Sequence, residues 1–593
     1  MSRNLFFKAS LTASLTASLA LALIGCEKPD AQIKPVSIIA AQMAPDTNPY
    51  ANGMVVAANP YATEAGIEAL RAGGSAVDAA IAVQTVLSLV EPQSSGVGGG
   101  AFLIFYDAAT GKVSAYNGRE TAPSAVDETL FLDDEGQPRR RFENIISGRS
   151  TGAPGVMAML DMAHKDHGKL PWADNFEAGI KLAEDGFTVS PRMARLVEMA
   201  GGFALKVQPA ARDYFFHEDG SPLVAGDIRD NKLYAETLRA LAKNPRAMNE
   251  GPIAEAIIAA IREEPRPGVL SLADLAAYQP QKTEALCSPY RDYILCGAMP
   301  PSSGGIAVQS IMGQLSNFDM KAFFDREKGM PTLAGWHVFA EASAMAYEDR
   351  DLFVADPDFA EVPTRAMLGA DYLKSRAALI SMETSLKDVQ AGDPAGFKPG
   401  KDATPDVPGT SHFSIVDKWG NVVSMTTTVE SLFGSMRMAG GFMLNNQLTD
   451  FSAAPRDAQG TLIANRPGPR KRPRSSMAPH IVFNKDGSFA FATGSPGGSS
   501  IIAYTAKTMI AMIDWGMGPQ EAANLANFIS RNGSIRLEEA GLDAAIIAGL
   551  EAKGHKVIRS KGEISGIHII RRNADGSYEG GADPRREGVA KSE

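Results

Sequence analysis

Apolar residues recur at helical intervals over much of the first 400 positions, and this spacing predicts several helices. Two of them are expected at 63–72 and 76–90. Ser75, followed three positions later by Asp78, has the pattern of a capping box at the start of the second helix. The glycine run 96–100 leads into a strand-like segment and lacks the Lys-Ser/Thr of a phosphate-binding loop, so we reject that interpretation.

After residue 409 the apolar spacing shortens to that of strands separated by tight turns. The predicted elements are two hairpins, 412–418 with 422–429 and 480–484 with 488–493, then helices at 499–515 and 541–553, and a last strand at 564–571. Strand-rich segments flanked by helices fit a layered α/β (α+β) sandwich.

The first 25 residues have the features of a targeting signal. Arg3 and Lys8 precede a short apolar stretch that ends in Leu-Ile-Gly-Cys at Cys26. This pattern resembles the bacterial lipoprotein signal, in which the cysteine is acylated and becomes the mature N-terminus. An uncleaved membrane anchor is the alternative, although the stretch is short for a bilayer. We expect a linker at 26–50 and an exported protein, anchored by lipid and facing the periplasm or the cell exterior.

Charge and histidine spacing narrow the range of partners. The net charge of −10 argues against a nucleic-acid binder, which must neutralise phosphates. His164 and His167 have H-x-x-H spacing, but no third ligand lies nearby, so we predict a solvated helix face instead of a metal site. No metal or organic cofactor is expected.

Two cysteines follow Cys26, namely Cys287 and Cys296, in a segment that predicts a hairpin over 283–297. A turn at Arg291-Asp292 places the two cysteines directly opposite each other in a non-hydrogen-bonded pair. Their Cα atoms would then be about 4.5 Å apart, near the short limit for a disulfide. A disulfide and two reduced core thiols both remain open.

Six sequence blocks together resemble the γ-glutamyltranspeptidases. In chain order they are NGRETAP at 117–123, PPSSGG at 300–305, TSHFSIVD at 410–417, LNNQ with DFS within 444–452, RPRSSM at 472–477 and GSPGG at 494–498. One block alone is a weak signal, whereas six in order over about 51–585 are specific. The resemblance implies a four-layer αββα sandwich of the N-terminal-nucleophile hydrolase type. A large subunit, 51–409, and a small subunit, 410–593, would build it jointly after self-cleavage.

The chemistry of the Gly409–Thr410 bond can be argued separately. A threonine hydroxyl is a poor nucleophile until a base takes its proton. An N-terminal threonine carries its own base, because its free α-amine has a pKa of about 7.7–8.0. Gly409 has no side chain to obstruct attack of the Thr410 hydroxyl on its carbonyl. Thr410 is therefore the predicted nucleophile of both self-cleavage and turnover.

The resemblance also implies roles for the remaining site residues. Thr428 would orient the Thr410 hydroxyl, and the backbone N–H groups of Gly497 and Gly498 would form an oxyanion hole. The α-carboxylate of the substrate would be held by Arg119, Ser475 and Ser476, and its α-ammonium by Asp450, Gln447 and Glu430. Such opposed charges suit the zwitterion of a γ-glutamyl donor.

The sequence departs from the family pattern at two places. Glu430 stands where many members have Asn, and the segment between Ser452 and Lys471 is short for a lid and contains no Tyr, which predicts a more open pocket. The expected activity is hydrolysis of glutathione or similar γ-glutamyl compounds, or transfer to an amino acid or dipeptide. A cephalosporin or glutaryl-amide acylase with the same nucleophile, and a processed but inactive binding lipoprotein, are the alternatives.

Overall fold

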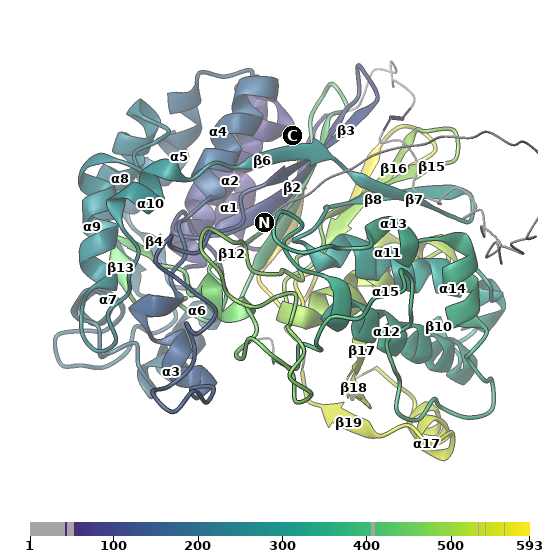
Figure 1. Ribbon diagram of the computed structural model, residues 1–593. Coiled ribbons are helices and arrows are strands. Elements are labelled where there is room, and N and C mark those ends of the chain that lie inside the picture. Colours follow the sequence, from purple (N-terminus) through teal and green to yellow (C-terminus); the bar gives the residue numbers. More distant parts are fainter. Residues whose placement is uncertain (1–41, 44–51, 405–408, 532, 540, 563) are drawn as a thin grey trace, which may run out of the picture.

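The computed structural model describes residues 42–43, 52–404, 409–531, 533–539, 541–562 and 564–593 (Figure 1). The predicted signal 1–25, Cys26 and the linker 26–50, apart from Gln42 and Met43, lie outside the described residues. Within the described part of the chain, no helix is both long enough and apolar enough to cross a membrane.

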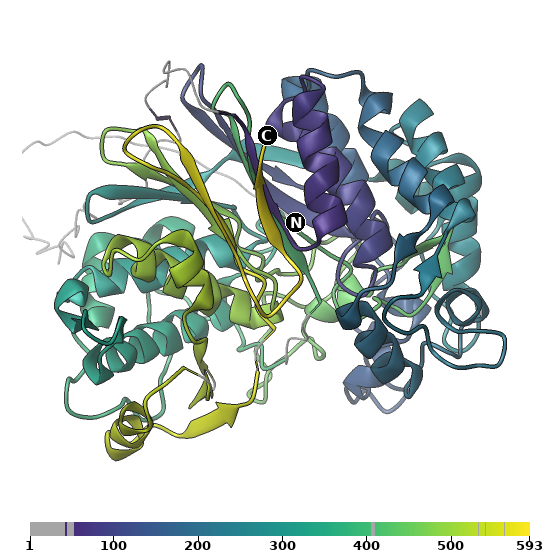
Figure 2. The ribbon, with the colours of Figure 1, turned by 180° about the vertical axis from the view of Figure 1, so that it is seen from behind.

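Two antiparallel sheets lie face to face in the centre of the molecule (Figures 1 and 2). The first has the order β22 (Val589–Ser592), β1 (Met54–Ala57), β11 (Ser411–Val416), β12 (Val422–Thr428), β2 (Gly100–Asp107), β3 (Lys112–Asn117), β6 (Gln281–Glu284). The second has the order β21 (Tyr578–Ala582), β20 (His568–Arg572), β16 (Phe489–Gly494), β15 (His480–Asn484), β8 (Tyr293–Gly297), β7 (Leu286–Tyr290). In both sheets, strands from before and after residue 409 are hydrogen-bonded neighbours, so the two halves of the chain build the sheets together.

The central strands β11, β12 and β2 of the first sheet are buried on both faces, and β2 shows the consequence in its nearly continuous apolar sequence. In β2, Leu103 and Phe105 belong to the core on one face, whereas Phe102, Ile104 and Tyr106 belong to the core on the other. Successive strand side chains point to opposite faces, so a strand between two cores needs apolar residues at every position.

Helices cover the outer face of each sheet (Figure 2). The first sheet is covered by α1 (Pro60–Arg71), α2 (Ala76–Val90) and α4 (Val156–His167), and the second by α11 (Ser303–Leu315), α12 (Leu333–Phe353) and α15 (Ile501–Ile513). Helix, sheet, sheet and helix therefore form four layers. This arrangement confirms the predicted αββα sandwich.

Elements with strong local signals are confirmed. Helix α2 has the predicted bounds, and Ser75 and Asp78 cap each other's backbone N–H groups. Both predicted hairpins form, as β11–β12 and β15–β16. Strands β1, β21 and β22 were not predicted, because each has only four or five residues. Strands β1 and β22 also pair with segments far away in sequence, whereas β21 forms a hairpin with β20.

The cysteine hairpin has the predicted register but not the predicted length. Cys287 lies opposite Cys296 in β7 and β8, and the two form a disulfide with their Cα atoms 4.1 Å apart. The prediction that this hairpin begins at residue 283 is wrong, because Gln281–Glu284 is β6 and pairs with β3 in the other sheet. The chain changes sheets at Ala285, which a local pattern does not reveal.

The prediction of a solvated face at His164 and His167 is also wrong. Helix α4 packs this face onto the first sheet, and both histidines are half-buried. His164 Nε2 lies 3.2 Å from Asp78 Oδ1, and the His167 ring stacks on Phe105. Both are therefore packing residues at the helix–sheet boundary.

Three buried histidines, His412, His480 and His568, lie on strands of the two facing sheets. Burial lowers the pKa of His568 to about 3, whereas an unfolded histidine titrates near about 6.5. Between these values the unfolded state binds more protons, so acidification favours unfolding by up to about 1.4 kcal/mol per pH unit for this group. We expect His568→Phe to lower, by about this amount, the slope of unfolding free energy against pH in urea titrations at pH 4–6. Equal slopes in both proteins would contradict this assignment.

Candidate active site

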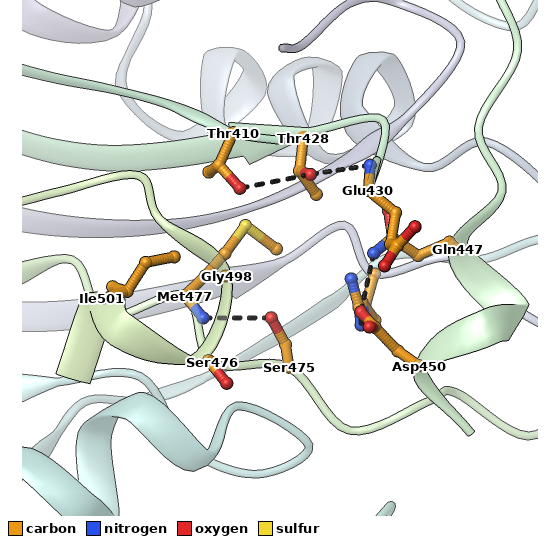
Figure 3. A pocket seen from close by; sticks show the side chains of 11 residues that line it. Thr410, Thr428, Glu430, Gln447, Asp450, Ser475, Ser476, Met477, Gly498 and Ile501 are labelled. Carbon is orange, nitrogen blue, oxygen red and sulfur yellow. Dashed lines mark hydrogen bonds and ion pairs between the residues drawn. The ribbon is translucent and has the colours of Figure 1, made fainter. Parts of the chain in front are cut away.

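A pocket opens beside the start of β11 and the end of β12 (Figure 3). Its walls are formed by Arg119, Thr410, Thr428, Glu430, Gln447, Asp450, Ser475, Ser476, Met477, Gly498 and Ile501. Apart from Gly497, every residue that the sequence placed in the catalytic and binding set lines this pocket. Met477 and Ile501 were not predicted, although they lie next to predicted positions in the fold. Residues up to 382 positions apart in the sequence thus meet in one cavity, since 501 − 119 = 382.

Thr410 lies immediately before β11, opposite the last residue of β12. The register pairs Ser411 with Thr427, so the next pair brings Thr410 and Thr428 together, and their hydroxyl oxygens lie 3.4 Å apart. The Thr428 hydroxyl donates to the carbonyl of Gly409 at 2.5 Å and accepts from the backbone N–H of Glu430 at 2.8 Å. One hydroxyl therefore contacts both sides of the Gly409–Thr410 bond.

Arg586 binds the backbone of Thr410, and this residue was not predicted from the sequence. Arg586 Nη1 donates to the Thr410 carbonyl at 2.7 Å. The same guanidinium lies 3.5 Å from Glu91, whose carboxylate also accepts from the hydroxyl of Ser411 at 2.8 Å. Burial lowers the pKa of Arg586 to about 9. No spacing in the sequence links position 586 to position 410, so only the fold reveals this contact.

Two pocket residues of opposite charge, Arg119 and Asp450, form a direct ion pair. Arg119 Nη2 lies 2.5 Å from Asp450 Oδ2, and the guanidinium also donates to the carbonyls of Pro473 and Arg474. The Arg119 side chain is fully buried, and its Nη1 has no hydrogen-bond partner among the described residues. Gln447 Nε2 donates to Asp450 at 2.9 Å. Neighbouring groups thus hold the ion pair in place, and Arg119 Nη1 can still donate a hydrogen bond.

Glu430 adds a second carboxyl group to this pocket. Its backbone is left-handed, with φ 82°, and its side chain is buried. Burial, followed by the nearby charge of Asp450, raises the pKa of Glu430 to about 8. Arg141 Nη2 lies 3.3 Å from one carboxyl oxygen, and Asn446 Nδ2 donates to the other. Burial and the charge of Asp450 thus favour the protonated form of this carboxyl, whereas Arg141 favours the charged form.

Ser475, Ser476 and Gly498 form another part of the pocket wall (Figure 3). Ser303 donates to the carbonyl of Ser475 from both its N–H and its hydroxyl, and Arg350 donates to the Ser476 hydroxyl at 2.6 Å. Gly498 begins the short helix η5 (Gly498–Ser500), which leads into α15. Gly497 has φ 139°, and a Cβ there would lie 2.5 Å from the ring of Tyr504. Only glycine fits that position.

The four-layer sandwich, with a threonine at the start of a central strand, defines the N-terminal-nucleophile hydrolase class. A family profile described as gamma-glutamyltranspeptidase matches residues 62–592. The chain belongs to the γ-glutamyltranspeptidase family. The resemblance found in the sequence is therefore confirmed, whereas the roles of individual site residues and the cut at residue 409 stay predictions.

Relatives of the chain include enzymes named for different acyl groups. The chain is 36% identical over 543 residues to a glutathione hydrolase proenzyme of Escherichia coli (strain K12), covering 90% of each chain. It is 32% identical to the acylase ACY 1 proenzyme of Pseudomonas sp. (strain SE83), covering 91% of this chain and 93% of the relative. The crystal structure of cephalosporin acylase from Bacillus halodurans superposes with a TM-score of 0.80 and 25% identity, covering 92% and 96% of the two chains.

Proposed function

We propose that the chain cuts itself between Gly409 and Thr410 and then hydrolyses or transfers γ-glutamyl groups through an ester on Thr410. The observation that carries this proposal is the Arg119–Asp450 ion pair, which lies in the same pocket as the Thr410–Thr428 hydroxyl pair. A γ-glutamyl donor carries an α-carboxylate and an α-ammonium on one carbon, so it needs both charges close to the nucleophile. Glutathione and related γ-glutamyl compounds have this zwitterion.

The self-cleavage step follows from the contacts around the bond. The Thr410 hydroxyl attacks the Gly409 carbonyl carbon, and the hydrogen bond from Thr428 stabilises the negative charge that develops on the carbonyl oxygen. The C–N bond breaks, the proton of the hydroxyl passes to the nitrogen, and water hydrolyses the resulting ester. A Cβ at position 409 would lie 2.2 Å from the carbonyl oxygen of Glu430, so this tight approach requires glycine.

Turnover would use the same hydroxyl with a new base. The freed α-amine of Thr410 takes the hydroxyl proton, and the oxygen attacks the γ-carbonyl of the donor. The backbone N–H groups of Gly497 and Gly498 would stabilise the oxyanion, because they lie before a helix N-terminus. The amine product leaves with a proton, and water or the amine of an amino acid or dipeptide then takes the acyl group.

Substrate binding would satisfy the polar groups that face the pocket. Arg119 Nη1 has no hydrogen-bond partner among the described residues and would donate to the α-carboxylate, together with Ser475 and Ser476. Asp450 and the unpartnered Gln447 Oε1 would accept the α-ammonium. The Glu430 carboxyl can accept a further hydrogen bond from this ammonium, and the positive charge would lower its pKa.

An acylase that takes a glutaryl or cephalosporin side chain is the second candidate, favoured by the acylase relatives and by the raised pKa of Glu430, which weakens the negative charge available to an α-ammonium. A glutaryl amide has the same length as a γ-glutamyl amide but lacks the α-ammonium. We expect kcat/KM for γ-glutamyl-p-nitroanilide to exceed that for glutaryl-p-nitroanilide by at least about 100-fold, because a site built for a polar group discriminates against its absence. The reverse ratio would establish the acylase, and failure of the processed protein to cleave either would reject both enzymes.

We also propose that the protein is exported and carries lipid on Cys26. The support is the charged and apolar pattern before Cys26, together with the Cys287–Cys296 disulfide, since such bonds persist in oxidising compartments. Membrane attachment would then depend on the lipid, and the two subunits would remain together as an αβ pair through their shared sheets.

A further inference from the structure

A second cluster of polar side chains lies away from the pocket, between α12 and the end of α17 (Ala544–Ala552) (Figure 1). His337 and Glu341 are four positions apart on α12, so they lie on one helix face. His555 reaches them from the turn after α17. One donor atom from each side chain lies within 4.8 Å of the others. The three side chains are buried or nearly so, with Glu341 3% and His555 6% exposed.

Backbone contacts turn the three donor atoms toward one another. His337 Nε2 lies 2.7 Å from the carbonyl of Ser381, which can only accept, so Nε2 carries the proton and Nδ1 presents its lone pair. That Nδ1 lies 2.7 Å from His555 Nε2. The Glu341 Oε2 accepts from the backbone N–H of Leu386 at 2.7 Å, leaving Oε1 3.7 Å from His555. Metal-binding histidines are oriented in the same way, by a carbonyl on the far ring nitrogen.

Glu341 has no lysine or arginine partner in the part of the chain that the structure describes. Among the described residues, His555 is the only ionisable group paired with Glu341. Lys553 and Glu383 are the other charged groups acting on His337. A bound cation would supply a positive charge beside the Glu341 carboxylate.

We propose that His337, Glu341 and His555 bind a divalent transition-metal ion, with zinc as the ion that best fits the donor set. Two imidazoles and one carboxylate, completed by water, are a common zinc coordination. Zinc–nitrogen bonds of about 2.0–2.1 Å in a tetrahedral site place ligand atoms roughly 3.3 Å apart. The ion would therefore replace the proton shared by His337 and His555 and separate the two nitrogens by about half an ångström.

The positions of the ligands give this site a structural consequence. His337 and Glu341 precede residue 409, whereas His555 follows it. If the chain is cut as proposed above, the ion would join the large subunit to the small one at a place distant from the active site. This consequence alone rests on the proposed function, since the three ligands are already together in the uncut chain.

The test is metal binding to the full-length protein without a histidine tag, first treated with a chelator. After incubation with zinc and gel filtration, elemental analysis should find one zinc per chain, with an increase in Tm. Cobalt in place of zinc should give visible absorption of a tetrahedral site. His555→Ala and Glu341→Gln should each weaken zinc binding by at least about 100-fold, in line with the loss of a ligand. The exposed His217 serves as control, and His217→Ala should bind normally.

Two results would overturn the proposal: wild-type protein that retains well under one zinc per chain, or full binding by both ligand variants. Glu341→Gln preserves the size of the side chain and its contact with Leu386. If His555→Ala does not fold, zinc binding by Glu341→Gln therefore decides whether the proposal stands. The uncut Thr410→Ala chain should bind zinc as the wild type does. Failure of processing and failure of the metal site are therefore separate outcomes.

Discussion

Thr410→Ala is expected to yield one uncut chain in place of two and to lower amidase activity by on the order of 10⁶-fold, as when the nucleophile of a hydrolase is removed. The reason is that the attacking hydroxyl and the base would come from the same residue, and the base exists only after the Gly409–Thr410 bond breaks. A denaturing gel and the intact mass of the purified protein measure the cut directly. In the wild type the smaller fragment should begin at Thr410 and contain 593 − 409 = 184 residues.

Two matched variants make this result specific. Thr410→Ser keeps a hydroxyl and an α-amine and should still give two chains. Thr427→Ala removes a neighbouring buried hydroxyl that has no hydrogen-bond partner among the described residues, so processing should continue. Two chains from Thr410→Ala would rule out the mechanism. The mass of the larger wild-type fragment also reports whether it begins with an acylated Cys26.

Local sequence signals were sufficient to predict elements whose boundaries are set by a cap or a turn within the element itself. The Ser75–Asp78 box fixed the start of α2, and the Arg291-Asp292 turn fixed the register that joins the cysteines. Such features depend on residues a few positions apart. The two-sheet architecture was different, because it came from the resemblance of six blocks and not from periodicity. Strands buried on both faces, such as β2, have no alternation that would show which side they face.

The site was predicted as a set of residues but not as a set of contacts. Arg119 and Asp450 were assigned to opposite ends of the substrate, whereas the structure also pairs them with each other at 2.5 Å. Arg586 was missed because its contact with Thr410 spans 176 residues. Long-range contacts of this kind are set by the packing of the whole sandwich. The spacing of residues in a single sequence does not predict them.

The same limit explains the histidines. The H-x-x-H spacing drew attention to His164 and His167, but His164 contacts Asp78 of α2 and His167 stacks on Phe105 of the first sheet. His337 and Glu341 have the i, i+4 spacing of one helix face, but their third partner, His555, lies 218 residues beyond His337. Spacing within a helix is visible in the sequence, whereas convergence of distant elements is not.

Asp450→Asn is expected to lower kcat/KM for γ-glutamyl-p-nitroanilide by about 10²–10³-fold, or roughly 3–4 kcal/mol, the usual effect of truncating one member of a buried charge pair. Asparagine keeps the shape and can still bond to Gln447, but it removes the negative charge that would face the α-ammonium. It also leaves Arg119 with Glu120, at 3.8 Å, as its one remaining acidic partner among the described residues. For glutaryl-p-nitroanilide, which lacks the ammonium, we expect less than about a 10-fold change.

The ratio of the two substrates is the decisive measurement, because a variant that merely misfolds would lose both activities together. A denaturing gel should show that Asp450→Asn is still processed, since Asp450 makes no contact with the Gly409–Thr410 bond among the recorded hydrogen bonds. Asp134→Asn removes a fully exposed carboxylate and should leave both rates unchanged. If Asp450→Asn lowered both rates equally, Asp450 would be supporting Arg119 and not the substrate ammonium. If neither rate changed, the zwitterion would be bound elsewhere, and the γ-glutamyl specificity would lose the observation on which it depends.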